Sequence, residues 1–201
     1  MTAPEDEISA SPDARRPLAV ALWLNVGLAA GLLAGGLVAA SSGLTANALD
    51  NTSDAVVYGL SYFAVTRGSA WRARAARLSG VMLLILSGGV LVDVGRRALE
   101  GGDPIGTAMV VITLIAAGVN LASLKLLHRV RFGNVNLRAA WTFSINDLVA
   151  NVGVLVAGLL VAWLGQAWPD LVVGFAIALV AAKGGTDILM DARRTARANG
   201  A

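Results

Sequence analysis

The sequence predicts an all-α polytopic membrane protein with six transmembrane helices and both termini in the cytoplasm. Of its 201 residues, 56% are hydrophobic and only 14% are charged, and the mean hydropathy is +0.69. Because soluble domains carry roughly 25% charged residues, this composition is typical of a membrane protein. Apolar runs of about 20 residues, the length that crosses a ~30 Å hydrocarbon core, recur along the chain.

Short polar stretches separate six apolar segments, and each segment is long enough for one membrane crossing. These segments cover residues 17–40, 44–66, 76–99, 104–127, 138–164 and 168–190.

The expected division of the chain follows from these segments. Residues 1–16, "MTAPEDEISASPDARR", are acidic and contain proline, and we expect a disordered cytoplasmic tail rather than a signal peptide. A six-helix transmembrane domain would occupy 17–191 and a short cytoplasmic tail 192–201, with no soluble C-terminal domain.

Positive charges predict the orientation of the helices. Most Lys and Arg residues lie in the termini and in the two connections "RGSAWRARAARLS" and "HRVRFGNVNLR", whereas Arg96 and Arg97 lie on the opposite side. Connections rich in Lys and Arg stay in the cytoplasm, so we expect a multi-pass protein of the bacterial inner membrane. The basic sequence pI of about 9.9 suits an anionic inner leaflet. Nucleic-acid binding is not expected, because no soluble domain is predicted to carry a basic groove.

The second apolar segment carries an unusual polar stripe within "ALDNTSDAVVYGLSY". At about 100° per residue, Asn47, Asp50, Asn51 and Asp54 fall within roughly a 100° arc of one helix face. A carboxylate in a bilayer costs about 2.5–3.5 kcal/mol, so this stripe should face a hydrated cavity or a polar partner.

The fifth segment, "WTFSINDLVANVGVLVAG", has a matching polar face. Ser144, Asp147 and Asn151 lie at positions i, i+3 and i+7, which share one side of a helix. Asn25 in the first segment and Asn120 in the fourth either form hydrogen bonds between helices or line a pathway.

Three carboxyl groups brought together between two helices would repel one another, and some would stay protonated unless a cation were bound. A divalent cation resolves this repulsion, and protons are the natural alternative occupant. A purely structural polar network and a proton relay without metal are the competing interpretations. The chain has no cysteine, which excludes thiolate sites, and we interpret its single histidine, His128, as an interfacial residue.

Two further sets of charged residues can be explained by local pairing, without a binding site. Asp93 precedes Arg96 and Arg97 by three and four residues, a spacing that predicts a local ion pair. Lys183 and Asp187 lie four residues apart, where pairing or extension of the lysine toward the interface is sufficient.

With these features, the sequence resembles the cation diffusion facilitator family of metal–proton antiporters over about residues 17–193. The resemblance rests on the six segments and on "ALDNTSDAVVYGLS", "SINDLVANVGVLVAG" and "WPDLVVGFAIAL". It implies a four-ligand intramembrane metal site to which the second and fifth helices each contribute two ligands. It also implies a cytoplasmic ferredoxin-like domain after the sixth helix, which we do not expect here.

The family pattern maps onto three aspartates. Asp50 and Asp54 match the pair on the second helix, and Asp147 matches the final Asp on the fifth. The position four residues before Asp147 is Phe143, which cannot bind a metal. Our candidate for the fourth ligand is Asn151. The other supporting residues are Ser144, Asn51 and Asn47.

The resemblance implies a secondary transporter, not an enzyme, that exports a divalent cation from the cytoplasm in exchange for protons. The metal is the transported substrate, so no cofactor is expected. Zinc leads by the family pattern, and an oxygen-dominated site also suits cadmium, cobalt, iron(II) or manganese. The expected partners are the metal ion, protons, the lipid bilayer and a second copy, in a homodimer formed through the membrane domain. The alternative is a non-transporting helical scaffold with an internal polar network.

Overall fold

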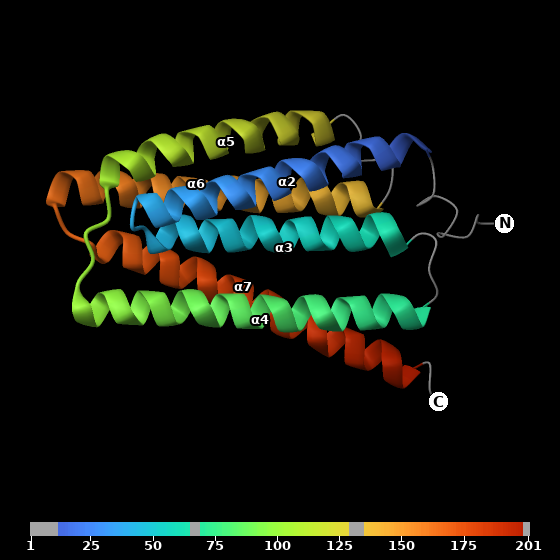
Figure 1. The fold of residues 1–201 in the computed structure, drawn as a ribbon. Coiled ribbons are helices and arrows are strands. Elements are labelled where there is room, and N and C mark those ends of the chain that lie inside the picture. The colour runs from blue at the N-terminus through green and yellow to red at the C-terminus, as the bar shows by residue number, and fades with distance from the viewer. Residues whose placement is uncertain (1–11, 65–68, 129–134, 199–201) are drawn as a thin grey trace.

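The computed structural model describes residues 12–64, 69–128 and 135–198 (Figure 1). Within these ranges the chain forms six helices and no strand. The helices are α2 (Pro12–Val38), α3 (Ser42–Ala64), α4 (Ser69–Glu100), α5 (Gly106–His128), α6 (Val135–Leu164) and α7 (Trp168–Ala198).

Five of the described helices, α2, α4, α5, α6 and α7, are long and apolar enough to cross a membrane. The protein is therefore a multi-pass membrane protein. The exception is α3, a helix of 23 residues, because its polar stripe lowers its mean hydropathy. In the bundle, α3 nevertheless runs beside the other helices (Figure 1). Hydropathy alone thus accounts for five of the six crossings that the sequence predicts.

Several helices extend beyond the apolar segments. Helix α4 begins at Ser69 and includes "SAWRARAAR", and α7 continues to Ala198 through "DARRTARA". Alanine and arginine are among the best helix-forming residues, so these polar ends continue the helices. Helix α2 begins at Pro12, where proline is tolerated in the first turn. Residues 12–16 of the expected tail are therefore helical, and residues 1–11 lie outside the described part.

Helix α3 is the most central element. It packs against α2, α4, α6 and α7, while α5 packs on α6 and α2 (Figure 1). One apolar core joins α2, α3, α5 and α6 around Leu32, Leu44 and Val154, and a second core joins α3, α4 and α7 around Leu49 and Leu83. Both cores include α3, so its polar stripe is covered by other helices.

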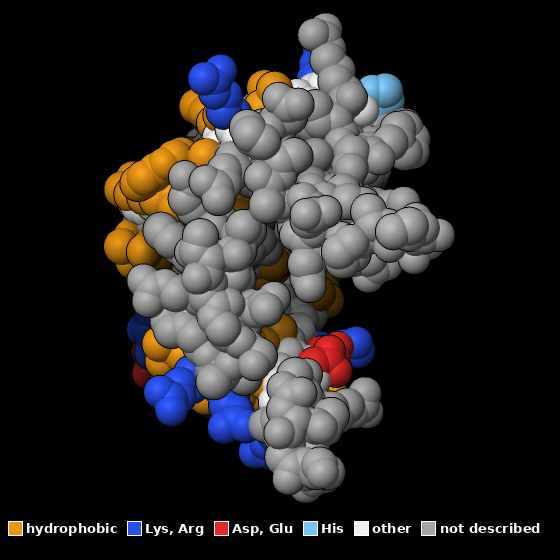
Figure 2. Space-filling model, turned by 90° about the vertical axis from the view of Figure 1, so that its right-hand side faces the viewer, with side chains coloured by type: hydrophobic (Ala, Val, Ile, Leu, Met, Phe, Trp, Pro, Cys, Tyr) orange, Lys and Arg blue, Asp and Glu red, His pale blue; other side chains and the backbone are white. Residues whose placement is uncertain are grey.

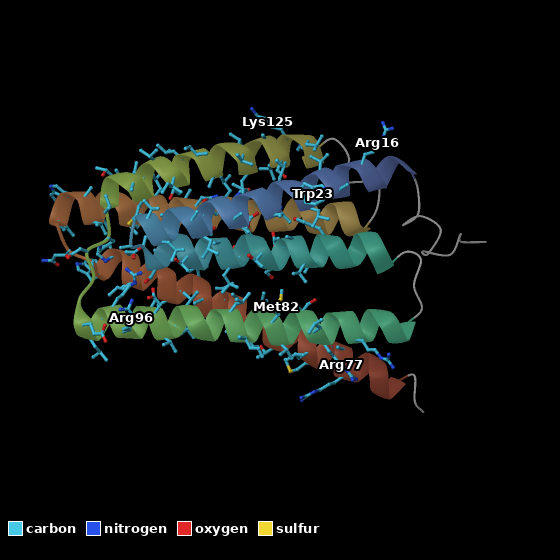
Figure 3. The ribbon with its side chains drawn as sticks, viewed as in Figure 1. Arg16, Trp23, Arg77, Met82, Arg96 and Lys125 are labelled. Carbon is cyan, nitrogen blue, oxygen red and sulfur yellow. The ribbon has the colours of Figure 1, made fainter. Side chains whose placement is uncertain are left out.

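Both ends of the described chain lie at the same end of the bundle (Figure 1). Figure 2 looks onto this end and shows Lys and Arg side chains at several places around its edge. Arg16 and Arg77 lie toward it, and Arg96 lies toward the opposite end (Figure 3). The chain therefore enters and leaves the bundle at the end that carries Arg16 and Arg77.

Candidate cation-binding site

The polar stripe of α3 faces the interior of the bundle. Asn47 and Asn51 are fully buried and Asp54 is 7% exposed, whereas Asp50 at the edge of the stripe is partly buried. Burial of polar groups follows from the central place of α3, since α6 and α7 cover faces that would otherwise meet lipid.

The polar face of α6 lies opposite this stripe. Asp147 and Asn151 are each 1% exposed. The Nδ2 group of Asn47 donates a hydrogen bond to Oδ1 of Asn151 at 2.7 Å, which joins α3 directly to α6. Asn51 turns back toward its own helix and donates through Nδ2 to the backbone oxygen of Asn47 at 3.0 Å. The structure therefore brings the two polar faces together.

Several buried polar atoms in this region have no hydrogen-bond partner within the described part of the protein. They are Oδ1 of Asn51, Oδ2 of Asp54, Nδ2 of Asn151 and both carboxyl oxygens of Asp147. A buried polar group without a partner costs about 1–3 kcal/mol, and more when it is charged. Four of these five atoms are oxygens, so a bound cation would satisfy most of the set.

The carboxyl groups also interact with one another through their charges. Asp54 is close enough to repel both Asp147 and Asp50, and Asp147 also repels Asp50. Among the described residues, only other acids act through their charge on Asp54 and Asp147, and Lys183 pairs instead with Asp187 on the exposed surface of α7. A positive charge between α3 and α6 would relieve this repulsion.

These side chains do not form a complete metal-coordination site. In the described part of the chain, no three Asp, Glu or His side chains gather closely enough to hold a metal ion by themselves. The oxygen of Asn151, our candidate fourth ligand, is engaged by Asn47. The side chains of Ser144 and Phe143 lie outside the described part of the structure. A complete ligand set therefore needs further oxygens or a shift of α3 against α6.

Two more buried amides lie on neighbouring helices. Asn25 of α2 donates to the backbone oxygen of Ala21 in its own helix at 3.0 Å, and its Oδ1 has no partner. Asn120 of α5 is 2% exposed, and its Nδ2 has no partner. The hydrogen bond of Asn25 thus stays within α2, and both amides keep an unpartnered polar atom in the interior.

A second carboxylate cluster, which sequence reasoning did not identify, lies where α3 and α7 begin. Asp170 accepts hydrogen bonds from Oγ of Ser41 at 2.6 Å, from the backbone N–H of Ser42 at 2.8 Å and from that of Gly43 at 2.9 Å. The Ser41 hydroxyl in turn accepts from the backbone N–H of Leu44 at 3.0 Å. Together these groups satisfy the first free N–H groups of α3.

Residues of α4 extend this cluster, and we call the whole set, Ser41, Ser42, Asp93, Arg96, Arg97 and Asp170, the outer network. Asp93 accepts from the Ser42 hydroxyl at 2.8 Å and pairs with Arg97 at 2.8 Å and Arg96 at 3.2 Å. Arg97 also donates to the backbone oxygen of Ala40 between α2 and α3. The predicted local ion pair is present, and it also joins α4 to the start of α3 and to the connection between α2 and α3. The signals in the sequence were Ser41 before α3, a helix-capping residue type, and Asp170 in the first turn after Pro169.

Comparison with known proteins agrees with this architecture. The model of the cation efflux transmembrane domain matches residues 18–195. A "Cadmium, cobalt and zinc/H(+)-K(+) antiporter" of Bacillus velezensis is 25% identical over 119 residues, which cover 58% of this chain and 38% of that protein. The "Metal cation efflux system protein CzcD" of Cupriavidus metallidurans is 23% identical over 176 residues, which cover 82% of this chain and 56% of that protein. The chain thus spans less than two thirds of either relative. It belongs to the cation efflux family, the cation diffusion facilitators that its sequence resembles.

Proposed function

We propose that the protein is a secondary transporter that exports a divalent transition-metal cation from the cytoplasm in exchange for protons. The observation that carries this proposal is the Asp147 carboxyl group, which is 1% exposed, has no partner on either oxygen and lies near a second buried carboxyl group, Asp54. Asp50, Asp54 and Asp147 would bind the cation, with Asn151 after release from Asn47.

Membrane placement supports the proposal. We infer that all six helices cross the bilayer and that the end carrying Arg16 and Arg77 faces the cytoplasm, in agreement with the preference of Lys and Arg for that side. The polar stripe of α3 is compatible with a crossing, because intramembrane carboxylates face the bundle interior rather than lipid. The bacterial relatives favour the inner membrane, and a homodimer would form through the membrane helices.

The chemistry of exchange follows from the ligands. Carboxyl groups bind a metal when deprotonated and release it when protonated, so metal and protons compete for the same oxygens. Movement of the helices would open the site alternately to each side of the membrane, as in other secondary transporters. The name of the Bacillus velezensis relative favours cadmium, cobalt and zinc. An oxygen-rich site is also suited to iron(II) and manganese.

The alternative is a helical scaffold that uses the same residues as a polar network. The hydrogen bond between Asn47 and Asn151 favours this alternative, because it joins α3 to α6 without a metal. It does not account for the unpartnered oxygens of Asp54 and Asp147, which a scaffold has no reason to keep.

Transport into proteoliposomes tests the proposal. The purified chain, reconstituted with an imposed pH gradient, is expected to take up Zn²⁺, Cd²⁺ or Co²⁺ at a rate that rises with the gradient. Asp147→Asn should abolish uptake. Asp187→Asn, which removes a carboxylate from an exposed pair on α7, is the matched control and should leave uptake unchanged. Uptake independent of the gradient would refute proton exchange, and absence of both uptake and saturable metal binding would favour the scaffold.

A further inference from the structure

The cation site described above lacks oxygens. Asp54 and Asp147 are buried, but the three carboxyl groups do not form a closed group, and the Asn151 oxygen already accepts a hydrogen bond. The missing ligand need not come from α3 or α6. Helix α5 packs along α6 and carries Asn120, a buried amide that the proposed site does not use.

The register of α5 against α6 is defined by close glycine contacts. A Cβ atom on Gly106 of α5 would lie 2.5 Å from the backbone nitrogen of Ala162 in α6, and a Cβ atom on Gly158 of α6 would lie 2.9 Å from Cβ of Met109. Only glycine permits this approach, so the two antiparallel helices touch with Met109 opposite Gly158.

From this contact, Asn120 and Asp147 lie at one level. Asn120 comes 11 residues after Met109, and Asp147 comes 11 residues before Gly158. Because the helices are antiparallel, both steps lead in the same direction, by about three turns or roughly 16 Å. Eleven residues also return each side chain to within about 20° of its starting face. Asn120 and Asp147 therefore share a level and lie close to the faces on which α5 and α6 touch at Met109 and Gly158. The same face of α6 also meets α3, through Asn151.

Burial agrees with this register. Asn120 is 2% exposed and Asp147 is 1% exposed, so each points into the packed interior rather than toward the bilayer. Nδ2 of Asn120 and both carboxyl oxygens of Asp147 have no protein partner. Buried polar groups are usually satisfied, so two unsatisfied groups at one level of adjacent helices have room for a ligand that serves both.

We propose that Asn120 is a ligand of the transported cation beside Asp147 and that it supplies an amide oxygen from α5. The inference rests on the proposed function, because it concerns the same cation. Rotation of the amide presents either its oxygen or its nitrogen, and the oxygen is an established ligand of hard divalent cations. The cation would then join α5 to α6 as well as α3 to α6.

Thr113 provides a matched control on the same helix face. It lies seven residues before Asn120, is fully buried, and its hydroxyl oxygen likewise has no partner. Seven residues correspond to about 10 Å along the helix, so Thr113 lies too far from the level of Asp147 to bind the same ion. A variant there removes a buried unpartnered polar atom without touching the proposed ligand set.

Metal binding to the purified full chain in lipid nanodiscs tests the proposal, with Zn²⁺ followed by titration calorimetry and Co²⁺ by its visible absorption. Asn120→Ala should weaken binding of either ion at least tenfold, since even outer partners of metal ligands contribute about 10–100-fold to affinity. It should also change the Co²⁺ spectrum through loss of one oxygen. Thr113→Val should alter neither the affinity nor the spectrum.

Two outcomes separate failure of this inference from failure of the proposed function. If the wild-type chain binds neither ion, the proposed function fails. If it binds them and a folded Asn120→Ala variant binds equally well, Asn120 is not a ligand. Should Asn120→Ala not fold, Asn120→Asp decides, because it keeps an oxygen at the same position. Binding equal to or tighter than wild type supports the proposal, and weaker binding overturns it.

Discussion

Asp170 and Asp147 are both buried carboxyl groups, each 1% exposed, but their surroundings are opposite. Asp170 accepts three hydrogen bonds from Ser41, Ser42 and Gly43. Asp147 accepts none on either oxygen from the residues that the structure describes. The difference shows that burial of an acid does not indicate its role. The supply of donors distinguishes a carboxylate that stabilises the fold from one that can bind a ligand.

The supply of donors depends on where along a helix each acid lies. Asp170 lies in the first turn of α7 and against the first turn of α3, where backbone N–H groups have no partner within their own helix. Both helix N-termini also favour a negative charge. Asp147 lies in the interior of α6, where the neighbouring backbone N–H groups are used by the helix itself. It must be satisfied by side chains, by water or by a ligand.

The largest effect is expected when the negative charge of Asp147 is removed. Asp147→Asn is expected to lower metal affinity by more than about 100-fold, because loss of a direct ligand should exceed the 10–100-fold cost of losing an outer partner. It should not destabilise the fold, since it removes a charge that lacks a protein partner. Calorimetric titration with Zn²⁺ and the thermal unfolding midpoint together measure both effects. A large fall in the midpoint would show that Asp147 has a structural partner.

The opposite pattern is expected for Asp170. Asp170→Ala leaves the Ser41 hydroxyl and two backbone N–H groups at the start of α3 without an acceptor. At about 1–3 kcal/mol for each buried group, the free energy of unfolding should fall by about 3 kcal/mol or more. Denaturation in mixed micelles measures this loss. The folded fraction should keep its metal affinity, and a selective loss of affinity would place Asp170 in the binding machinery instead.

The close approach of α7 to α3 can be tested at Gly174. A Cβ atom there would lie 2.9 Å from the carbonyl carbon of Ser42, a backbone atom that cannot rotate away. Gly174→Ala is expected to cost about 1–3 kcal/mol, as overpacking generally does. Gly88→Ala in α4 is the control, because a Cβ atom there meets nothing within 4 Å. Comparable unfolding free energies for the two variants would contradict the close packing of α3 on α7.

The smallest effect is expected at the exposed edge of the outer network. Arg96 pairs with Asp93 and Glu100 on the surface, so Arg96→Ala should leave the unfolding midpoint unchanged. Arg97 is more buried and also donates to the Ala40 backbone, so Arg97→Ala should cost about 1 kcal/mol. The same denaturation assay compares them. An equal loss in both variants would mean that Arg97 does not connect the helices.

Much of the helical framework follows from the sequence, because apolar length and the 3.6-residue period are local properties. The placement of Asn47, Asn51 and Asp54 on one inward face, and of Asp147 and Asn151 on another, required only their spacing. Whether α3 crosses the membrane was harder to predict, since the polar stripe that marks the site also lowers the hydropathy of that helix.

Other relations depend on distant parts of the chain. The contact of Asp170 with Ser42 joins residues 128 positions apart, and that of Asn47 with Asn151 joins residues 104 positions apart. The former gives a buried acid, Asp170, its structural partners, and the latter occupies the oxygen of a candidate ligand, Asn151. Neither could be predicted from spacing, because each depends on which helices become neighbours.

The sequence by itself determined the class of the protein, the helical faces that carry carboxyl groups and the family to which the chain belongs. These are encoded in composition and in short-range periodicity. Only the tertiary structure decided which acids receive donors and which helix lies opposite Asp147. The physical reason is that hydrogen-bond satisfaction and helix register arise from the packing of α3, α5, α6 and α7, and packing joins residues that no local pattern connects.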